Sequence, residues 1–361
     1  MKKIVSIIAA MTLAASLVSC GTRADAAAET EQAEAAEDVQ GAQDVQDAAA
    51  EAEGEIAEDA QDAQSSMAEV SADVTAEGLP AAEPGKAASG LSEYVDSNGE
   101  SATIPAGFVV SKEKDEQVIN EGLVVIGPDG SEYVWIPTTV TELAQRDFGA
   151  FFSGGDSISN YYDETDLPEY RAMADSVDRF GGFYFSRYEI SRSENDLPAS
   201  RQVTDGKPYK IWTNFSPQDA TEICAKLYAD NDTVQGFFPW GSNWDTVLQW
   251  LIDTGNKEPA QISSDSSGWG NYANDSFSVN ANNRSTGIWE EAEANNICDL
   301  AGNNWEWTQE RCGSSYVMRG GGCTLMGGGC NGNDYPAAVR DPLPGNNHHP
   351  NVVVRAGLFI K

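Results

Sequence analysis

Basic residues are scarce in this chain. Of its 361 residues, 22 are Lys or Arg and 57 are Asp or Glu, so the formal net charge is −35 at pH 7. Proteins that bind nucleic acids need a basic patch that neutralises phosphates, and no such patch occurs here. The composition therefore excludes DNA and RNA as expected partners.

Several enzyme motifs are also absent. The sequence has no G-x-x-x-x-G-K-[ST], no G-x-G-x-x-G directly after a strand, no H-E-x-x-H and no G-x-S-x-G. Nucleotide-binding, zinc-protease and serine-hydrolase functions each depend on one of these patterns. Those three functions consequently have no support in the sequence.

The N-terminal apolar run is too short for a comfortable membrane span. Lys2 and Lys3 precede an apolar run over residues 4–18, and a short polar exit follows, which is typical of an export signal over residues 1–19. The sequence Leu17-Val-Ser-Cys20 resembles the bacterial lipoprotein processing box. This resemblance implies that Cys20 is the first mature residue, is acylated, and anchors an extracytoplasmic protein to the membrane at the cell surface. The alternative is a plain secretory signal in which Cys20 is coincidental.

Cysteines are few and odd in number once Cys20 is set aside. The remaining five stand at positions 224, 298, 312, 323 and 330. An odd number outside the cytoplasm leaves at least one thiol unpaired, so a complete disulfide framework is not expected.

Residues 20–90 form an acidic linker rich in Ala, Glu, Asp and Gln. Residues 21–90 contain 18 acidic side chains against Arg23 and Lys86. Such a composition cannot bury enough apolar surface to fold, and its like charges repel each other. We expect a disordered or partly helical stalk that holds a folded domain, residues 91–361, away from the membrane.

The folded domain is predicted to contain short strands, two helices and much coil. Extended, β-rich segments occupy residues 102–110, 122–137 and 180–190, and the second contains a hairpin turn at Pro128-Asp129-Gly130. A helix is predicted after Ser216-Pro217, with Asp219 in its first turn and with Ala220, Ile223, Cys224 and Leu227 at helical spacing. This spacing makes Cys224 a core residue. A second helix is predicted to begin near Trp244 and to end before Gly255, and residues 262–289 are predicted to be long loops.

Four residues close together in the C-terminal third carry oxygen donors. Asp299, Gly302, Asn304 and Glu306 provide two carboxylates and intervening carbonyls that can wrap a calcium ion. Trp305 and Trp307 flank the last carboxylate. The alternative is that the acidic residues only solvate a turn while the tryptophans fill the core.

The pattern D-x-x-G-N-x-W-E-W-T at residues 299–308, followed by Arg319-Gly-Gly, resembles the signature of the formylglycine-generating-enzyme (sulfatase-modifying factor) family. The resemblance implies an α+β domain with a C-type-lectin-like fold, few helices, short strands and much coil. It also implies a structural calcium ion on the four residues of the turn. Arg319 and Arg340 are expected in scaffold ion pairs.

One branch of this family oxidises a substrate cysteine to formylglycine with two thiols that hold copper. When this chain is aligned with that branch on Arg319-Gly-Gly, Cys330 falls at the position of the second thiol. The position of the first thiol is occupied by Leu325, and Cys323 lies two residues before it. A copper-dependent oxidase that uses Cys323 and Cys330 is therefore the alternative function. A non-haem iron site needs a histidine-rich triad, and only His348 and His349 exist.

A second branch consists of ligand-binding variable proteins, many of them surface lipoproteins, which are diversified by retroelements on a fixed scaffold. Residues 319–361 are the candidate variable region, and their Asn, Tyr and His residues offer adaptable hydrogen bonds, as antibody loops do. We predict a non-catalytic, surface-displayed protein that binds an extracellular protein or glycan. An ordinary Gly/Asn-rich loop without a ligand, in a structural protein of the cell envelope, is the plainer alternative. The predicted contact residues are Asn331, Asn333, Asp334, Tyr335, His348 and His349.

Overall fold

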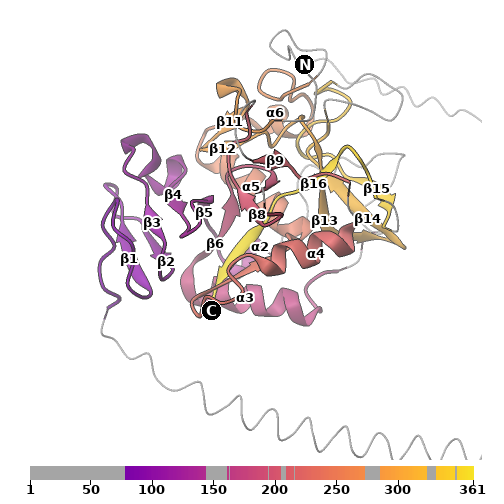
Figure 1. Cartoon of the computed structure of the whole chain (residues 1–361). Coiled ribbons are helices and arrows are strands. Elements are labelled where there is room, and N and C mark those ends of the chain that lie inside the picture. Colours follow the sequence, from indigo (N-terminus) through magenta and orange to yellow (C-terminus); the bar gives the residue numbers. More distant parts are fainter. Residues whose placement is uncertain are drawn as a thin grey trace, which may run out of the picture. The chain divides into compact units, whose positions relative to one another are not determined.

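The largest sheet of the computed structural model has six antiparallel strands in the order β10-β17-β6-β5-β4-β3 (Figure 1). The C-terminal strand β17 lies between β10 and β6, so the end of the chain completes the sheet. The predicted hairpin turn joins β4 to β5, as expected. The strands are β3 (Val109–Val110), β4 (Val124–Ile126), β5 (Glu132–Pro137), β6 (Gly182–Ser186), β10 (Val234–Phe237) and β17 (Gly357–Ile360).

The structure describes residues 78–143, 161, 163–193, 195–204, 209–214, 216–272, 285–322, 331–345 and 348–361. The folded unit begins at Glu77, which is earlier than the boundary at residue 91 that the sequence predicted. Residues just after Glu77 are held by the first strands, since Gly85 N–H donates to the Val110 carbonyl over 2.8 Å and Ala88 N–H donates to the Phe108 carbonyl over 2.9 Å. Residues 78–90 therefore belong to the domain rather than to the linker.

A four-stranded sheet, β15-β14-β13-β16, carries the C-terminal third. Strands β13 and β14 form a hairpin, and β16 runs parallel to β13. Its strands are β13 (Trp305–Cys312), β14 (Ser315–Arg319), β15 (Asp341–Pro344) and β16 (Val352–Val354). Three smaller sheets contain β1 (Ser92–Val95) with β2 (Ser101–Ile104), β8 (Pro198–Ser200) with β7 (Ile190–Arg192) and β9 (Lys210–Ile211), and β11 (Glu293–Ala294) with β12 (Ile297–Cys298).

The described helices are α2 (Val140–Leu143), α3 (Pro168–Phe180), α4 (Pro217–Lys226), α5 (Gly241–Asp253) and α6 (Pro259–Ser263). Three short 3₁₀ turns, η1 (Lys114–Glu116), η2 (Ile119–Glu121) and η5 (Glu290–Ala292), lie in connections. Helix α3 was not predicted. Helix α4 begins where the sequence predicted, because Ser216 and Asp219 form a reciprocal capping box.

Helix α5 begins at Gly241, three residues before the predicted start at Trp244. Its first turn is capped by a distant acid, since the Glu164 carboxylate accepts from Gly241 N–H over 2.9 Å and from Ser242 N–H over 3.2 Å. A carboxylate at a helix N-terminus satisfies backbone donors that the helix itself leaves free. The early start thus depends on a tertiary contact.

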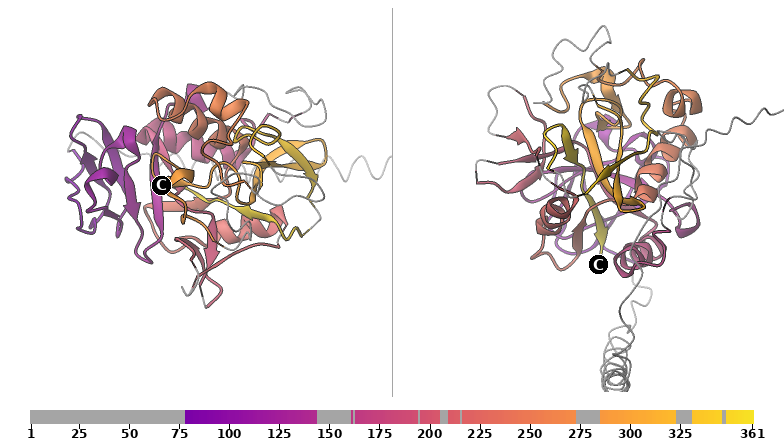
Figure 2. Two further views of the ribbon diagram at one scale, coloured as in Figure 1. Left: turned by 90° about the horizontal axis from the view of Figure 1, so that it is seen from above. Right: turned by 90° about the vertical axis from the view of Figure 1, so that its right-hand side faces the viewer.

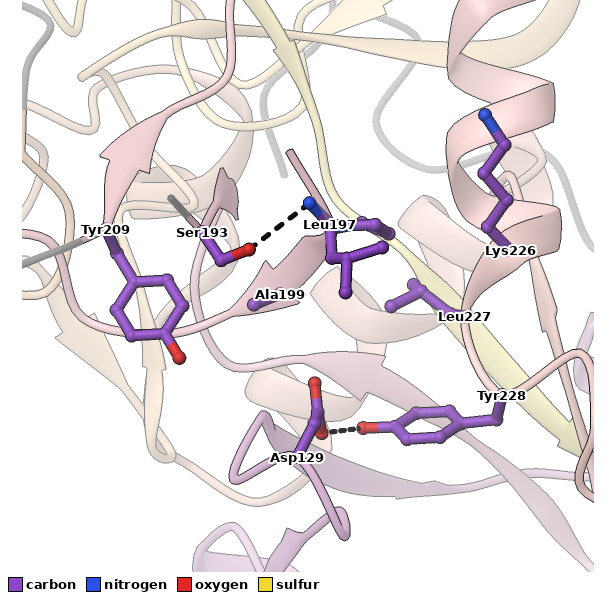
Figure 3. A pocket seen from close by; sticks show the side chains of 9 residues that line it. Asp129, Ser193, Leu197, Ala199, Tyr209, Lys226, Leu227 and Tyr228 are labelled. Carbon is purple, nitrogen blue, oxygen red and sulfur yellow. Dashed lines mark hydrogen bonds between the residues drawn. The ribbon is translucent and has the colours of Figure 1, made fainter. Parts of the chain in front are cut away.

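The end of α4 is tied to the turn between β4 and β5. The Tyr228 hydroxyl donates to Asp129 Oδ1 over 2.6 Å (Figure 3). Tyr228 also packs edge-on against Phe108, with ring centroids 4.8 Å apart. This contact holds the helix end beside the large sheet.

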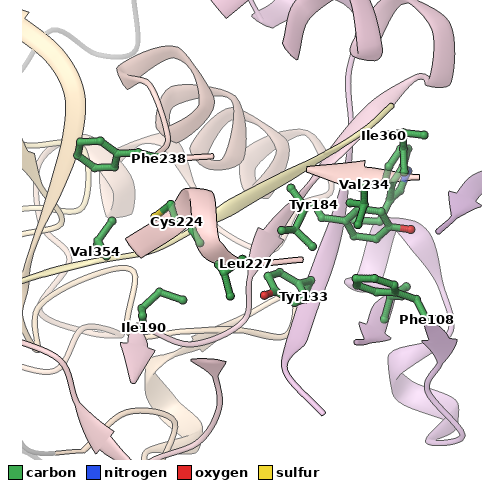
Figure 4. Packing of buried hydrophobic residues seen from close by; sticks show 14 of the residues in the cluster. Phe108, Tyr133, Tyr184, Ile190, Cys224, Leu227, Val234, Phe238, Val354 and Ile360 are labelled. Atoms are coloured by element: carbon green, nitrogen blue, oxygen red, sulfur yellow. The ribbon is translucent and has the colours of Figure 1, made fainter. Parts of the chain in front are cut away.

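Both faces of the six-stranded sheet are buried, and helices lie on both sides of the strands (Figure 2). In β5, Tyr133 and Trp135 enter the core on the α4 side, whereas Val134 and Ile136 enter the core on the side of α3 and α5. Cys224 lies in the first core and is fully buried, which confirms its predicted role (Figure 4). The α+β class with few helices, short strands and much coil is confirmed as well.

Candidate functional site

The turn between β12 and β13, together with the start of β13, holds the four residues predicted to bind calcium. Gly302 has φ of +79°, and a Cβ at this position would lie 2.3 Å from the Asn271 carbonyl oxygen. Only glycine fits this combination of conformation and space. Gly302 N–H donates to the Gly320 carbonyl over 2.8 Å, so the turn is fixed against the residue that follows β14.

Each carboxylate of the turn already has partners. Asp299 Oδ2 accepts from Thr286 Oγ1 over 2.9 Å and from Gly287 N–H over 2.8 Å. Glu306 forms a two-point ion pair with Arg355, at 2.8 Å from Nη2 and 3.1 Å from Nε. These residues are buried.

A third buried carboxylate, Glu189 before β7, lies against the same turn. It accepts from the Asn304 backbone N–H over 3.1 Å, from Asn304 Nδ2 over 2.8 Å and from Asn303 Nδ2 over 2.9 Å. Burial raises the pKa of Glu189 well above its usual range, and the charges of Glu306 and Asp299 raise it further, against the opposing effect of Arg355. Three acids therefore share one guanidinium.

The turn provides some of the oxygen ligands that a bound cation needs. Asn304 Oδ1 is buried and has no hydrogen-bond partner, and three buried acids lie around the turn. In contrast, both oxygens of Glu306 are taken by Arg355. Within the described ranges, no group of three or more His, Cys, Asp or Glu side chains is arranged to hold a metal ion. Calcium on Asp299, Gly302, Asn304 and Glu306 stays a prediction.

Four buried charges join α5, β13, β14 and the segment before β15. Arg319 Nη2 lies 2.5 Å from Asp245 Oδ1, and Arg319 Nη1 lies 3.4 Å from Glu310 Oε2. Arg340 binds the same two acids, through Nη2 to Asp245 and through Nε to Glu310 Oε1 over 3.0 Å. We call these residues the buried tetrad. The scaffold ion pairs predicted for Arg319 and Arg340 are confirmed.

The tetrad is excluded from water. Arg319, Arg340 and Glu310 have fully buried side chains, and that of Asp245 is 2% exposed. Burial raises the pKa of Asp245, whereas the two guanidiniums act in the opposite direction. Because each charge has two opposite partners, removal of one acid would leave two arginines without full compensation.

The first group of predicted ligand residues, 331–335, forms a preorganised turn. Asn331 Oδ1 accepts from the backbone N–H groups of Asn333, over 3.0 Å, and Asp334, over 2.8 Å. Asn333 and Asp334 are exposed. Tyr335 packs edge-on against Trp305, with ring centroids 5.4 Å apart, so its ring is partly used by the scaffold.

The second group, His348 and His349, lies beside α4. His348 Nε2 is 3.1 Å from Asp219 Oδ2, and the His349 carbonyl accepts from Asn214 N–H over 3.0 Å. His349 Nδ1 is buried without a hydrogen-bond partner. The structure thus places the two groups against different elements: the first packs on Trp305, and the second on α4.

His348 also lines a cavity of about 270 Å³ between α4 and the segment after β9. The sequence analysis did not identify the other lining residues as a site. A signal was available, because Asp219, Glu222 and Lys226 recur at helical spacing on α4, away from the core positions Ala220 and Cys224. The cavity is lined by Trp212, Asn214, Asp219, Glu222, Ile223, Lys226 and His348.

Three predicted cysteine sites lie outside the described residues. These are the lipidation site Cys20, with the signal at residues 1–19, and the copper-binding pair Cys323 and Cys330. In the part of the chain that is described, no helix is both long and apolar enough to cross a membrane. The lipid anchor and the oxidase alternative both stay predictions.

Comparison with known proteins finds structural similarity at a low level. No family model matches the chain, and no curated protein matches it. Treponema denticola variable protein 1 is 13% identical over 73% of this chain and 97% of that chain, with a TM-score of 0.26. The Major Tropism Determinant U1 variant is 13% identical over 79% of this chain and 75% of that chain, with a TM-score of 0.31. Such low similarity supports no inference about function.

We predict that the Glu310→Gln substitution destabilises the domain by about 3–5 kcal/mol, because both arginines of the tetrad lose a buried counter-charge. The free energy of unfolding in urea measures this effect. The matched control is Asp166→Asn, which removes an exposed ion pair with Arg171 and should cost less than about 1 kcal/mol. Equal losses in the two variants would contradict the role of the tetrad.

Proposed function

We propose that this chain is a lipid-anchored, extracytoplasmic protein whose C-type-lectin-like domain displays a ligand-binding surface on its last loops. The domain would resemble the formylglycine-generating-enzyme type of that fold and would be non-catalytic. Its acidic stalk would hold it away from the membrane. The expected partner is an extracellular protein or glycan.

The main support is the contrast between a buried frame and exposed loops in the C-terminal third. Arg319 and Arg340 are fully buried in the tetrad, and Arg355 is buried with Glu306. Between and after these anchors, Asn333 and Asp334 are exposed, and the His348 side chain is 57% exposed. Side chains on these loops can therefore contact a ligand without disturbing the core.

The cavity beside His348 suggests how a ligand would be held. Trp212 offers an aromatic surface, while Asp219, Glu222 and Lys226 offer charged groups around the same space. A few convergent polar groups beside an aromatic wall are common in ligand sites, since the polar groups set orientation and the wall supplies contact area. This combination suits polar ligands that also have apolar faces, as sugars and peptides do.

We predict that a triple variant, Asn333→Ala, Asp334→Ala and His348→Ala, loses ligand binding but keeps its stability. Exposed substitutions usually change the free energy of unfolding by less than about 0.5 kcal/mol each. Binding is measured on a printed glycan array and on an array of extracellular proteins, and the parent should bind a defined subset of spots at least tenfold more strongly than the variant.

The matched control for this experiment carries three exposed substitutions on α3, namely Glu169→Ala, Asp175→Ala and Asp178→Ala. It should retain the binding pattern of the parent. Binding that persists in the loop variant, or that is lost in the α3 control, would reject the loops as the ligand surface.

A structural calcium ion is the second part of the proposal. Asp299, Gly302, Asn304 and Glu306 would hold it, and the unpartnered Asn304 Oδ1 is the observation that supports it. Calcium would bind oxygens of these four residues and so join the turn to the start of β13.

We predict that calcium raises the stability of the domain, by about 2.7 kcal/mol when the free ion is at 100 times its dissociation constant. The unfolding transition is measured in excess calcium, in excess magnesium and with a chelator. Asn304→Ala should reduce the calcium effect, and magnesium should reproduce little of it. Identical unfolding transitions with calcium and with the chelator would exclude the ion.

The lipid anchor predicts a simple labelling result. In a bacterial host fed labelled palmitate, the full-length protein should carry the label and fractionate with membranes, because acyl chains bury many methylene groups. Cys20→Ser should abolish both properties, whereas Cys312→Ser should keep them. Label retained by the Cys20→Ser variant would show that Cys20 is not the acylated residue.

A further inference from the structure

A second cavity, also of about 270 Å³, lies near the C-terminal end of α4, beside the β4–β5 turn and the β7–β8 turn (Figure 3). None of the six predicted ligand residues lines it. Its walls are mainly apolar, and Leu197 on its rim is 60% exposed although it is a large hydrophobic residue. The lining residues are Asp129, Ser193, Leu197, Pro198, Ala199, Tyr209, Lys226, Leu227 and Tyr228.

Asp129 is the one carboxylate among these lining residues. Its Oδ1 accepts from the Tyr228 hydroxyl over 2.6 Å and from Ser131 N–H over 3.1 Å, and its Oδ2 accepts from Ser131 Oγ over 2.6 Å. A carboxylate offers about four acceptor positions, so one position on Oδ2 remains. Figure 3 shows this second oxygen turned away from Tyr228, in the direction of Ala199 and Leu197.

Asp129 forms no direct ion pair with any described residue, although the Arg201 guanidinium packs against Gly130, the next residue of the same turn. Among the described residues, no Lys, Arg or His nitrogen lies within 4.0 Å of this carboxylate. Arg201 instead stacks on the Tyr209 ring at 4.9 Å, and the ammonium end of Lys226 points away from the other labelled residues in Figure 3. The three groups that hydrogen-bond to Asp129 are two hydroxyls and a backbone amide, none of which carries a charge.

Tyr228 serves as a donor to Asp129 rather than as an acid. Burial raises the pKa of Tyr228 well above its usual value, and the neighbouring Tyr133 and Asp129 raise it further. The phenol therefore stays a hydrogen-bond donor at neutral pH. The cavity thus combines apolar and aromatic walls with one carboxylate.

We propose that this cavity binds a small organic amine, that is, a primary ammonium group on a short hydrocarbon or aromatic body. The ammonium would donate to Asp129 Oδ2, which gives a charge-assisted hydrogen bond of the strong kind. The body would contact Leu197, Leu227 and Tyr209. The size fits, because about 270 Å³ is at the lower limit of small-molecule sites. The net charge of −35 also favours a cation over an anion as the approaching ligand.

The test compares three probes with one body and different head groups: 2-phenylethylamine, 2-phenylethanol and 3-phenylpropionate. Titration calorimetry of the full-length protein at pH 7 should show saturable binding of the amine. The alcohol should bind at least tenfold more weakly, because it has no charge to pair with Asp129, and the carboxylate should bind more weakly still.

Two variants of the cavity separate charge from contact area. Asp129→Asn retains an acceptor for Tyr228 but removes the charge. The affinity for the amine should therefore fall by about ten- to a hundredfold, to that for the alcohol. Leu197 is exposed, so a polar side chain is tolerated there, and Leu197→Ser should weaken the binding of the amine and of the alcohol by the same factor. The matched control, Glu222→Gln in the neighbouring cavity, should bind the amine as the parent does.

Several results would overturn the amine site. Absence of saturable amine binding would do so, as would tighter binding of 3-phenylpropionate, since that result would assign the head group to Lys226. An Asp129→Asn variant that is folded and binds the amine normally would also overturn it. The loop variant of Asn333, Asp334 and His348 should bind the amine unchanged, so this outcome is independent of the proposed loop surface.

Discussion

The buried tetrad of Asp245, Glu310, Arg319 and Arg340 is the constraint on which the C-terminal third depends. Four charges without access to water tolerate only an arrangement in which each has its counter-charge. Arg319 and Arg340 stand at the two ends of a segment and bind the same two acids. The ends of this segment are thus held at one place in the core by two acids, Asp245 and Glu310, that lie outside the segment. A longer segment between these fixed ends would cost little free energy of folding, because the entropy of loop closure grows only slowly with length.

A second set of buried charges fixes the segment just before the last strand in the same way. Arg355 pairs with Glu306 in β13 and donates to the Ser186 and Arg187 carbonyls at the end of β6, over 3.0 Å each. The next strand, β17, then enters the large sheet between β10 and β6. The turn at residues 299–306 is consequently held from three sides, by Glu189, by Arg355 and by the backbone of Asn271 and Gly320. Its rigidity rests on these contacts, whether or not a cation is added.

Local signals in the sequence predicted the elements whose causes are local. Ser216 and Asp219 lie three residues apart and cap α4 by themselves, and Pro128-Asp129-Gly130 turns one hairpin. The start of α5 was missed because, beside the local Asn243 that accepts from Trp240 N–H, its first N–H groups are capped by Glu164, 77 residues away in sequence from Gly241. The same reason applies to the cavity beside the β4–β5 turn: Asp129, Leu197 and Tyr228 come from three separate segments, and no spacing in the sequence brings them together. The ion pairs of Arg319 and Arg340 were predicted from the family resemblance and not from local spacing, because their partners Asp245 and Glu310 lie far away in sequence.

Under the proposed function, stability and recognition would occupy different residues of this domain. Buried ion pairs contribute more to a unique arrangement than to net stability, because desolvation offsets much of their attraction. Exposed loop residues contribute little to either, so their side chains can differ at small cost to the fold. Asn331 shows the limit of this separation: its side chain accepts two backbone N–H groups and shapes its own turn. A substitution there would alter the loop backbone. Asn333 is a second case, because its side-chain amide donates to the Asp265 carboxylate and so ties the loop to the segment after α6. Exposure alone therefore does not decide which loop residues can differ freely.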